Sequence, residues 1–165
     1  MSFGFLLAGF LATTNAGRVG LAREASSPTS ATVALALAAG AVLVAVAVVF
    51  ADDALDALSI SPESFRIAAG IVLALTAIRT LVWPHAVSGP FGAVLITPEL
   101  TCLALSLGAD EPTGRTLGAA AVAIAIAGLA ASIRLPLPAA LGAQLLAALQ
   151  VVVAVALAIS GMRDV

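Results

Sequence analysis

Two clusters of polar residues interrupt stretches of this chain that are otherwise apolar. The first reads Thr13-Thr14-Asn15-Ala16-Gly17-Arg18, and the second reads Ile96-Thr97-Pro98-Glu99. Asn15 and Pro98 lie 98 − 15 = 83 positions apart in a chain of 165 residues. Polar groups at membrane depth cost free energy, and they usually serve a function. Two such interruptions at matching places in two halves predict a solute-binding site of the kind found in membrane transporters.

The first cluster offers hydrogen-bonding groups to a small solute. Asn15 is the only Asn in the chain, Thr13 and Thr14 precede it, and Gly17 allows the backbone to unwind. A broken helix exposes N–H groups that bind a carboxylate and C=O groups that bind a cation or an ammonium group. Alternatively, these side chains only hydrogen-bond a neighbouring helix. We favour the binding site, because polar residues that cluster at depth usually mark a pathway.

Glu99 has the strongest functional implication of any single residue. An ionised carboxylate in hydrocarbon costs on the order of 3 kcal/mol by insertion scales, so Glu99 must be protonated, paired or in contact with water. Such a group is suited to proton coupling. Alternatively, Pro98 begins the helix, and Glu99 is a first-turn residue near an aqueous entrance, stabilised by the helix dipole. Both alternatives place Thr97 and Thr101 beside the same break.

Two further polar groups lie inside apolar stretches. Gln144, in the last stretch, either faces the same cavity or hydrogen-bonds a neighbouring helix. Arg79 lies near the end of the third stretch, where a long side chain can reach the membrane interface. We expect Arg18, beyond the first break, to anchor its helix end in the same way.

The composition is that of an integral membrane protein. Hydrophobic residues make up 62% of the chain and charged residues 10%, whereas roughly a quarter of the residues of a soluble domain are charged. Strands of a membrane barrel alternate in polarity, but the run 31–51 is apolar on every side, so we expect helices. The formal net charge of −2 argues against a nucleic-acid partner.

Nothing in the sequence predicts an enzyme, a cofactor or a metal. Cys102 is the only Cys and His85 the only His, so neither a disulfide within the chain nor a zinc-binding pattern exists. No catalytic triad order and no phosphate-binding loop is present. We therefore expect a non-enzyme without a cofactor.

The apolar stretches predict an all-α polytopic fold with six transmembrane helices in a single domain, 1–165. Residues 1–83 would form one three-helix half and residues 84–165 the other, with breaks in the first and fourth helices. Because three is an odd number, the second half enters from the opposite side, so the halves would be inverted repeats. Pro62 and Glu63 have the residue types of a helix first turn. The predicted spans are 3–22, 31–51, 65–82, 91–108, 116–133 and 139–160; Asp52-Asp53 closes the second span, and 56–64 forms an acidic connector before the third.

The distribution of Arg gives an orientation. Three Arg residues lie on the side that carries both termini and four on the other, and the side with more Arg is usually cytoplasmic, so both termini are expected outside. The heavy use of Ala, Gly, Pro and Arg is typical of a GC-rich bacterial genome. The three are Arg66, Arg115 and Arg163, and the four are Arg18, Arg23, Arg79 and Arg134.

The segment 58–79 resembles the third-span signature of the MarC family of six-span bacterial membrane proteins. Arg66, Ile67, Ala69 and Gly70 closely match its Arg-Ile-small-Gly-Gly start, and Arg79 stands where the family also has an Arg. The resemblance implies that Arg66 forms a structural ion pair, with Glu63 or with an acid of the second connector.

Two further segments resemble MarC elements in the same order. Residues 11–15 are similar to the first-span element that ends in Asn-Pro, and residues 94–98 are similar to the fourth-span element around a Pro. This chain has Ala16 in place of the first Pro, Glu99-Leu100 where the family has a Gly-Pro-Gly type of break, and a shorter connector at 84–90. The family belongs with lysine-exporter type proteins, so the resemblance implies transport of small solutes, with small neutral amino acids as a candidate class.

Two hypotheses follow from the sequence. The first is a secondary transporter or exporter of a small solute, with a midplane site at the two breaks. The second is a scaffold or assembly subunit without transport activity, in which faces of small residues pack against partners. The expected partners are the lipid bilayer and a small-molecule substrate, and the small-residue faces are compatible with a homo-oligomer.

Overall fold

The chain is all-helical in the residues that the computed structural model describes, which are 2–14, 21, 29–83, 97–132 and 139–163. The predicted fold class is therefore confirmed at the level of helices. The described helices are α1 (Phe3–Thr14), α3 (Ser30–Val49), α4 (Ala51–Ala57), α5 (Pro62–Val82), α7 (Pro98–Gly108), α8 (Thr113–Ser132) and α9 (Ala139–Arg163).

Four of these helices are long and apolar enough to cross a membrane. α3, α5, α8 and α9 have 20, 21, 20 and 25 residues, and a helix needs roughly 20 residues to cross a hydrocarbon core. α1 and α7 have 12 and 11 residues, which is enough for about half of that thickness. The described part of the chain is thus a membrane protein with four candidate spans and two half-length helices.

The outer faces of the long helices suit contact with lipid. On α5, Ile71, Leu75, Ile78 and Val82 follow one another at helical spacing, and each is more than half exposed. The opposite face of α5 carries the buried residues Arg66, Ala69, Gly70, Leu73, Ala77 and Thr80. So much exposed apolar surface is unusual for a protein in water, but it is the ordinary outer surface of a helix bundle in a bilayer.

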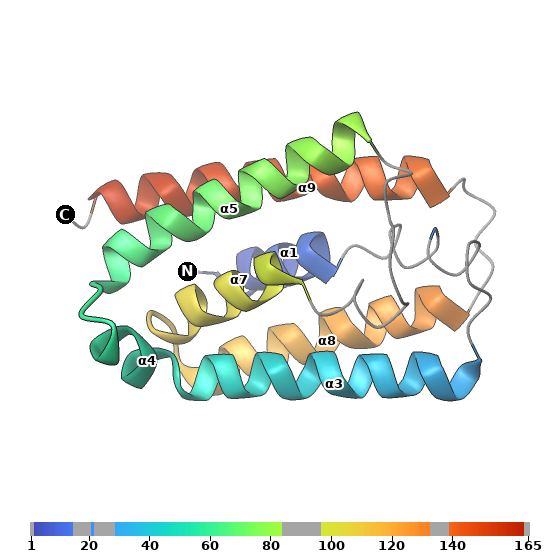
Figure 1. Ribbon diagram of the computed structural model, residues 1–165, viewed down its shortest axis with the longest axis horizontal. Helices are drawn as coiled ribbons and strands as arrows, with labels where there is room; N and C mark the ends of the chain where they lie inside the picture. Colours follow the sequence, from blue (N-terminus) through green and yellow to red (C-terminus); the bar gives the residue numbers. More distant parts are fainter. Residues whose placement is uncertain (1, 15–20, 22–28, 84–96, 133–138, 164–165) are drawn as a thin grey trace.

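The helices form three layers (Figure 1). α5 packs along α9 in one outer layer, and α3 packs along α8 in the other. α1 and α7 lie between them: α1 contacts α8 and α9, α7 contacts α3 and α5, and α1 and α7 contact each other. Figure 1 also shows both chain termini at the same end of the bundle, together with α4 and the turn between α7 and α8.

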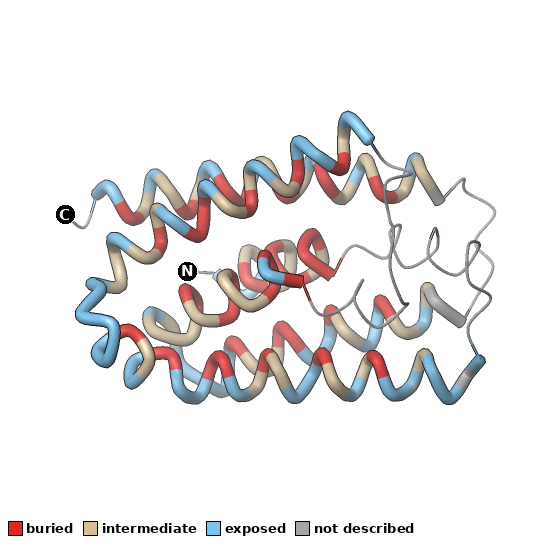
Figure 2. The backbone as a smooth tube through the Cα atoms, in the orientation of Figure 1, coloured by how far each residue is buried: buried red, intermediate tan, exposed pale blue. Residues whose placement is uncertain are grey.

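The core surrounds the two half-length helices. Their buried residues stand out in Figure 2, and they include Leu6 and Phe10 of α1 and Leu100, Leu103 and Leu107 of α7. Buried side chains of α3, α5, α8 and α9 complete the same cluster. The buried side chains of α1 and α7 therefore pack against buried side chains of all four long helices.

Glycine sets the spacing of the helices at the end that carries the termini. A Cβ on Gly70 of α5 would lie 2.7 Å from the backbone oxygen of Ala154 in α9. A Cβ on Gly161 of α9 would lie 2.8 Å from the backbone oxygen of Glu63 in α5, and one on Gly108 of α7 would lie 2.8 Å from the backbone of Val48 in α3. Small residues allow such close helix contacts in membrane bundles.

The start of α5 follows the predicted local chemistry. Ser61 caps the helix, because its hydroxyl accepts a hydrogen bond from the N–H of Ser64. Pro62 and Glu63 occupy the first turn, as predicted.

The prediction that Asp52 and Asp53 close the second span is wrong. α3 ends at Val49, and after Phe50 the chain forms the seven-residue helix α4, with Asp52 and Asp53 in its first turn. Acidic residues stabilise a helix at its N-terminus because they oppose the helix dipole. The two aspartates therefore begin a new helix instead of closing the preceding span.

Candidate functional site

α1 ends and α7 begins at the same depth in the bundle. A Cβ on Gly9 of α1 would contact Leu103 of α7 at 3.3 Å and Val153 of α9 at 3.5 Å, so these three residues share a level. α7 and α9 run antiparallel to α1 (Figure 1). Four residues of helix, about 6 Å, then lead from Gly9 to Thr13 and from Leu103 to Glu99 in the same direction. Thr13 and Glu99 therefore lie at about the same level.

The end of α1 is a buried polar terminus. Thr13 and Thr14 are 1% and 2% exposed. The Thr13 hydroxyl donates to the Gly9 carbonyl at 3.0 Å, and the Thr14 hydroxyl donates to the Phe10 carbonyl at 2.8 Å. These bonds satisfy the hydroxyls within the helix.

The start of α7 is the matching positive terminus. The Thr97 hydroxyl accepts a hydrogen bond from the N–H of Leu100 at 3.4 Å, and Pro98 is the first helical residue. Glu99 lies in the first turn and is only 2% exposed. Thr101 is half-buried, and its hydroxyl donates to the Thr97 carbonyl at 3.3 Å. The helix begins at Pro98 and Glu99 lies in its first turn, as in the second of the two explanations for Glu99. The Glu99 side chain is nevertheless buried inside the protein.

Gln150 of α9 and Thr76 of α5 complete this polar level. Gln150 lies three residues before Val153, about 4.5 Å along α9, which brings it to the depth of Thr13 and Glu99. Its amide nitrogen donates to the Thr76 hydroxyl at 2.8 Å and to the Leu73 carbonyl at 3.1 Å. The polar level thus includes residues of α1, α5, α7 and α9.

Gln150 was not among the residues predicted from the sequence, whereas Gln144 was. Gln150 lies near the centre of the predicted span 139–160, and this position alone could have identified it as a deep polar group. Gln144 instead donates to the Leu81 carbonyl at 3.4 Å, near the end of α5. This bond corresponds to the helix-packing alternative for Gln144.

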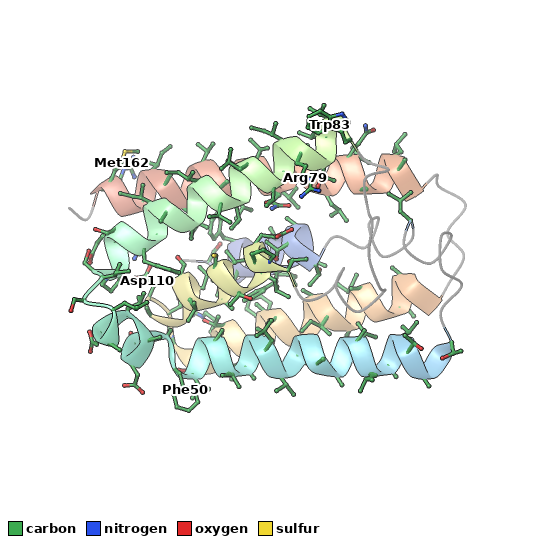
Figure 3. All side chains as sticks on the ribbon, in the orientation of Figure 1. Phe50, Arg79, Trp83, Asp110 and Met162 are labelled. Carbon is green, nitrogen blue, oxygen red and sulfur yellow. The ribbon has the colours of Figure 1, made fainter. Side chains whose placement is uncertain are left out.

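Several predicted residues are not part of the polar level or cannot be placed in it. Asn15, Gly17 and Arg18 lie outside the described residues. Arg79 is exposed in the last turn of α5, beside the exposed Trp83 (Figure 3), which agrees with an interfacial position.

Arg66 takes part in an ion pair whose acid was not predicted. Its guanidinium pairs with the carboxylate of Asp110, in the turn after α7, and also donates to the Ser160 hydroxyl at 3.0 Å. Figure 3 shows Asp110 beside the start of α5. The MarC resemblance implied Glu63 or an acid of the second connector as the partner of Arg66. Folding brings the turn after α7 to Arg66.

The polar level combines a helix N-terminus with an acidic side chain. The α7 N-terminus carries N–H groups of the kind that suit an anion, and Glu99 lies in the first turn of the same helix. Among the described residues, no group of His, Cys, Asp and Glu side chains has the arrangement of a metal site. No family model, curated protein or solved structure matches this chain.

Proposed function

We propose that this protein is a secondary transporter of a small solute, with its binding site where α1 ends and α7 begins. One observation carries the proposal: Thr13, Thr14, Thr97 and Glu99 are all buried at the ends of two half-length helices that meet at one depth. Helices that stop at midplane and present their termini to each other are typical of transporter sites.

The helix packing supports two inverted halves. Exchanging α1 with α7, α3 with α8 and α5 with α9 turns the contacts of α1 with α8 and α9 into those of α7 with α3 and α5. The same exchange leaves the α3–α8, α5–α9 and α1–α7 pairs unchanged. The bounds of α3 and α8 differ by one offset, 113 − 30 = 83 and 132 − 49 = 83, whereas those of α1 and α7 differ by 98 − 3 = 95 and 108 − 14 = 94.

The substrate class follows from the charges of the site and from the MarC resemblance. A zwitterion of modest size, such as a small neutral amino acid, would place its carboxylate at the α7 N-terminus and its ammonium group near Glu99. Glu99 would also carry the coupled proton, because it is an acid buried at the site. We propose a bacterial inner membrane as the location.

Uptake into proteoliposomes tests the proposal. Purified protein should accelerate the exchange of a radiolabelled small neutral amino acid, and an imposed pH gradient should drive its accumulation. Glu99→Gln should remove the effect of the pH gradient, since the amide cannot release a proton, and it should weaken substrate exchange, since the ammonium group loses its charged partner. Gln144→Leu is the matched control, because Gln144 bonds the end of α5 away from the polar level.

Two results would count against the proposal. Unchanged flux after Thr14, Asn15 and Glu99 are all replaced by apolar residues would exclude the site. The absence of any flux from a folded protein, over a panel of small zwitterions, would favour the scaffold hypothesis.

A further inference from the structure

Ser106 of α7 is a buried hydroxyl for which the described structure offers no hydrogen-bond partner. It is 3% exposed. Other helical hydroxyls of this protein, such as those of Thr13, Thr76 and Thr101, donate to the carbonyl four residues earlier, but that of Ser106 does not. Buried polar groups are nearly always hydrogen-bonded, so an exception requires an explanation. A hydroxyl that water reaches in another conformation is such an explanation.

Ser106 shares one face of α7 with Glu99, and Cys102 and the core residue Leu103 lie between them. Glu99 and Ser106 are seven residues apart, which is two helical turns and about 10.5 Å on the same face. Asp110 follows one turn later, just beyond the helix end at Gly108. The three residues lead from the proposed site to the end of the bundle that carries the termini.

The outer end of this face is closed. Asp110 is held by Arg66, whose side chain is 7% exposed and also bonds Ser160 of α9. The pair joins α5 to the turn between α7 and α8, so it connects the two proposed halves. Tight contacts flank it, because Gly161 packs against the backbone of Glu63 beside Arg66.

We propose that the face of α7 from Glu99 through Ser106 to Asp110 is an aqueous route to the proposed site, and that the Arg66–Asp110 ion pair is its gate. The route opens to the end that carries the termini. The inference rests on the proposed function, because only that function makes the polar level a solute-binding site. Its test does not require transport. Removing one partner of a buried ion pair strongly destabilises the state that contains it, so loss of the pair favours the open state.

The only cysteine of the chain is a natural reporter for this route. Cys102 lies three residues after Glu99 on α7 and is half-buried. A thiol reacts with a maleimide as the thiolate, which requires contact with water. We would therefore measure the rate at which a membrane-impermeant maleimide labels Cys102 when it is added to each face of sealed vesicles. A protease-sensitive C-terminal tag identifies the face that carries the termini.

Arg66→Ala should increase labelling of Cys102 from the face that carries the termini by about tenfold, which is the effect of raising an open state from about 1% to about 10% of the population. Arg115→Ala is the matched control. Arg115 pairs with Glu111 at 3.5 Å at the same end of the bundle, but both residues belong to the second half. This control should leave labelling unchanged.

Two more variants serve as controls. The first shows whether faster labelling results from loss of the ion pair or from misfolding, and the second moves the reporter thiol to another position. Exchanging the charges with Arg66→Asp and Asp110→Arg together should restore slow labelling if the ion pair is the gate. In a Cys102→Ala background, Ser106→Cys places the thiol on the route itself, and its labelling should respond to Arg66→Ala in the same way.

The inference is wrong if Arg66→Ala, in folded protein, changes the labelling rate of neither Cys102 nor the thiol introduced by Ser106→Cys. It is also wrong if Arg115→Ala raises both rates as much as Arg66→Ala does. Gated labelling without any amino acid flux would refute the proposed substrate but keep the route and its gate. Amino acid flux without gated labelling would refute the route and its gate but keep the proposed transport function.

Discussion

At the scale of single residues, the polar groups of the bundle differ in what they can contribute. Gln150 is 1% exposed and bonds two groups of α5, whereas Gln144 makes one long bond near a helix end. Hydrogen bonds between membrane helices contribute about 0.6 to 2 kcal/mol each. Both positions carry a Gln, so the depth and the hydrogen-bond partners of each side chain decide how much it contributes to stability.

Replacing Gln150 by Leu should lower the free energy of unfolding by about 1 kcal/mol, because the bond to Thr76 between α9 and α5 is lost. The measurement is chemical unfolding in detergent micelles. Gln144→Leu should stay within about 0.5 kcal/mol of the parent protein.

A double-mutant cycle with Thr76→Val identifies the cause. The two substitutions should be non-additive, since each removes the same hydrogen bond. Additive effects of Gln150→Leu and Thr76→Val would contradict the described contact.

At the scale of helices, close packing of α5 on α9 depends on glycine. Gly70 faces the backbone of Ala154, which cannot move away without displacing the whole of α9. A Cβ on Gly118 of α8 would meet no atom of a neighbouring helix within 4 Å, so Gly118 makes no such contact. The same residue type thus has a packing role at position 70 and none at position 118.

Gly70→Ala should lower the free energy of unfolding by about 1 to 3 kcal/mol, as expected for overpacking. Gly118→Ala should instead leave it unchanged or raise it by up to about 1 kcal/mol, because Ala is the better helix former. Thermal unfolding of both variants in the same detergent compares them. Equal stability of the two variants would show that α5 and α9 do not pack as described.

At the scale of the whole molecule, the structure places both termini and the turn between α7 and α8 at one end (Figure 1). The end of α5 at Trp83 lies at the other end of the bundle. This arrangement follows from the direction of each helix, whichever compartment each end faces.

Reporter tags should confirm this topology. Tags fused to the N-terminus, to the C-terminus and within the 109–112 turn should react from one compartment, which we expect to be the outside from the Arg distribution. A tag inserted after Trp83 should react from the opposite compartment. A C-terminal tag on the same side as the Trp83 tag would exclude the described bundle.

The amino-acid sequence by itself determined the class of the protein and most helix bounds. Hydropathy is a property of each stretch alone, so it predicted α5, α8 and α9 closely. Local chemistry also located the start of α5 and the break before Pro98. It failed at 52–57, where acidic residues suit both a helix end in water and a helix start.

Only the tertiary structure decided which polar residues meet. Arg66 pairs with Asp110, 44 positions away (110 − 66 = 44), and Gln150 bonds Thr76, 74 positions away. Sequence spacing relates residues within one helix, but contacts between helices depend on how each helix is rotated and shifted against its neighbours. That rotation and shift result from packing of the whole bundle, so the polar level of α1, α5, α7 and α9 exists only once the chain has folded.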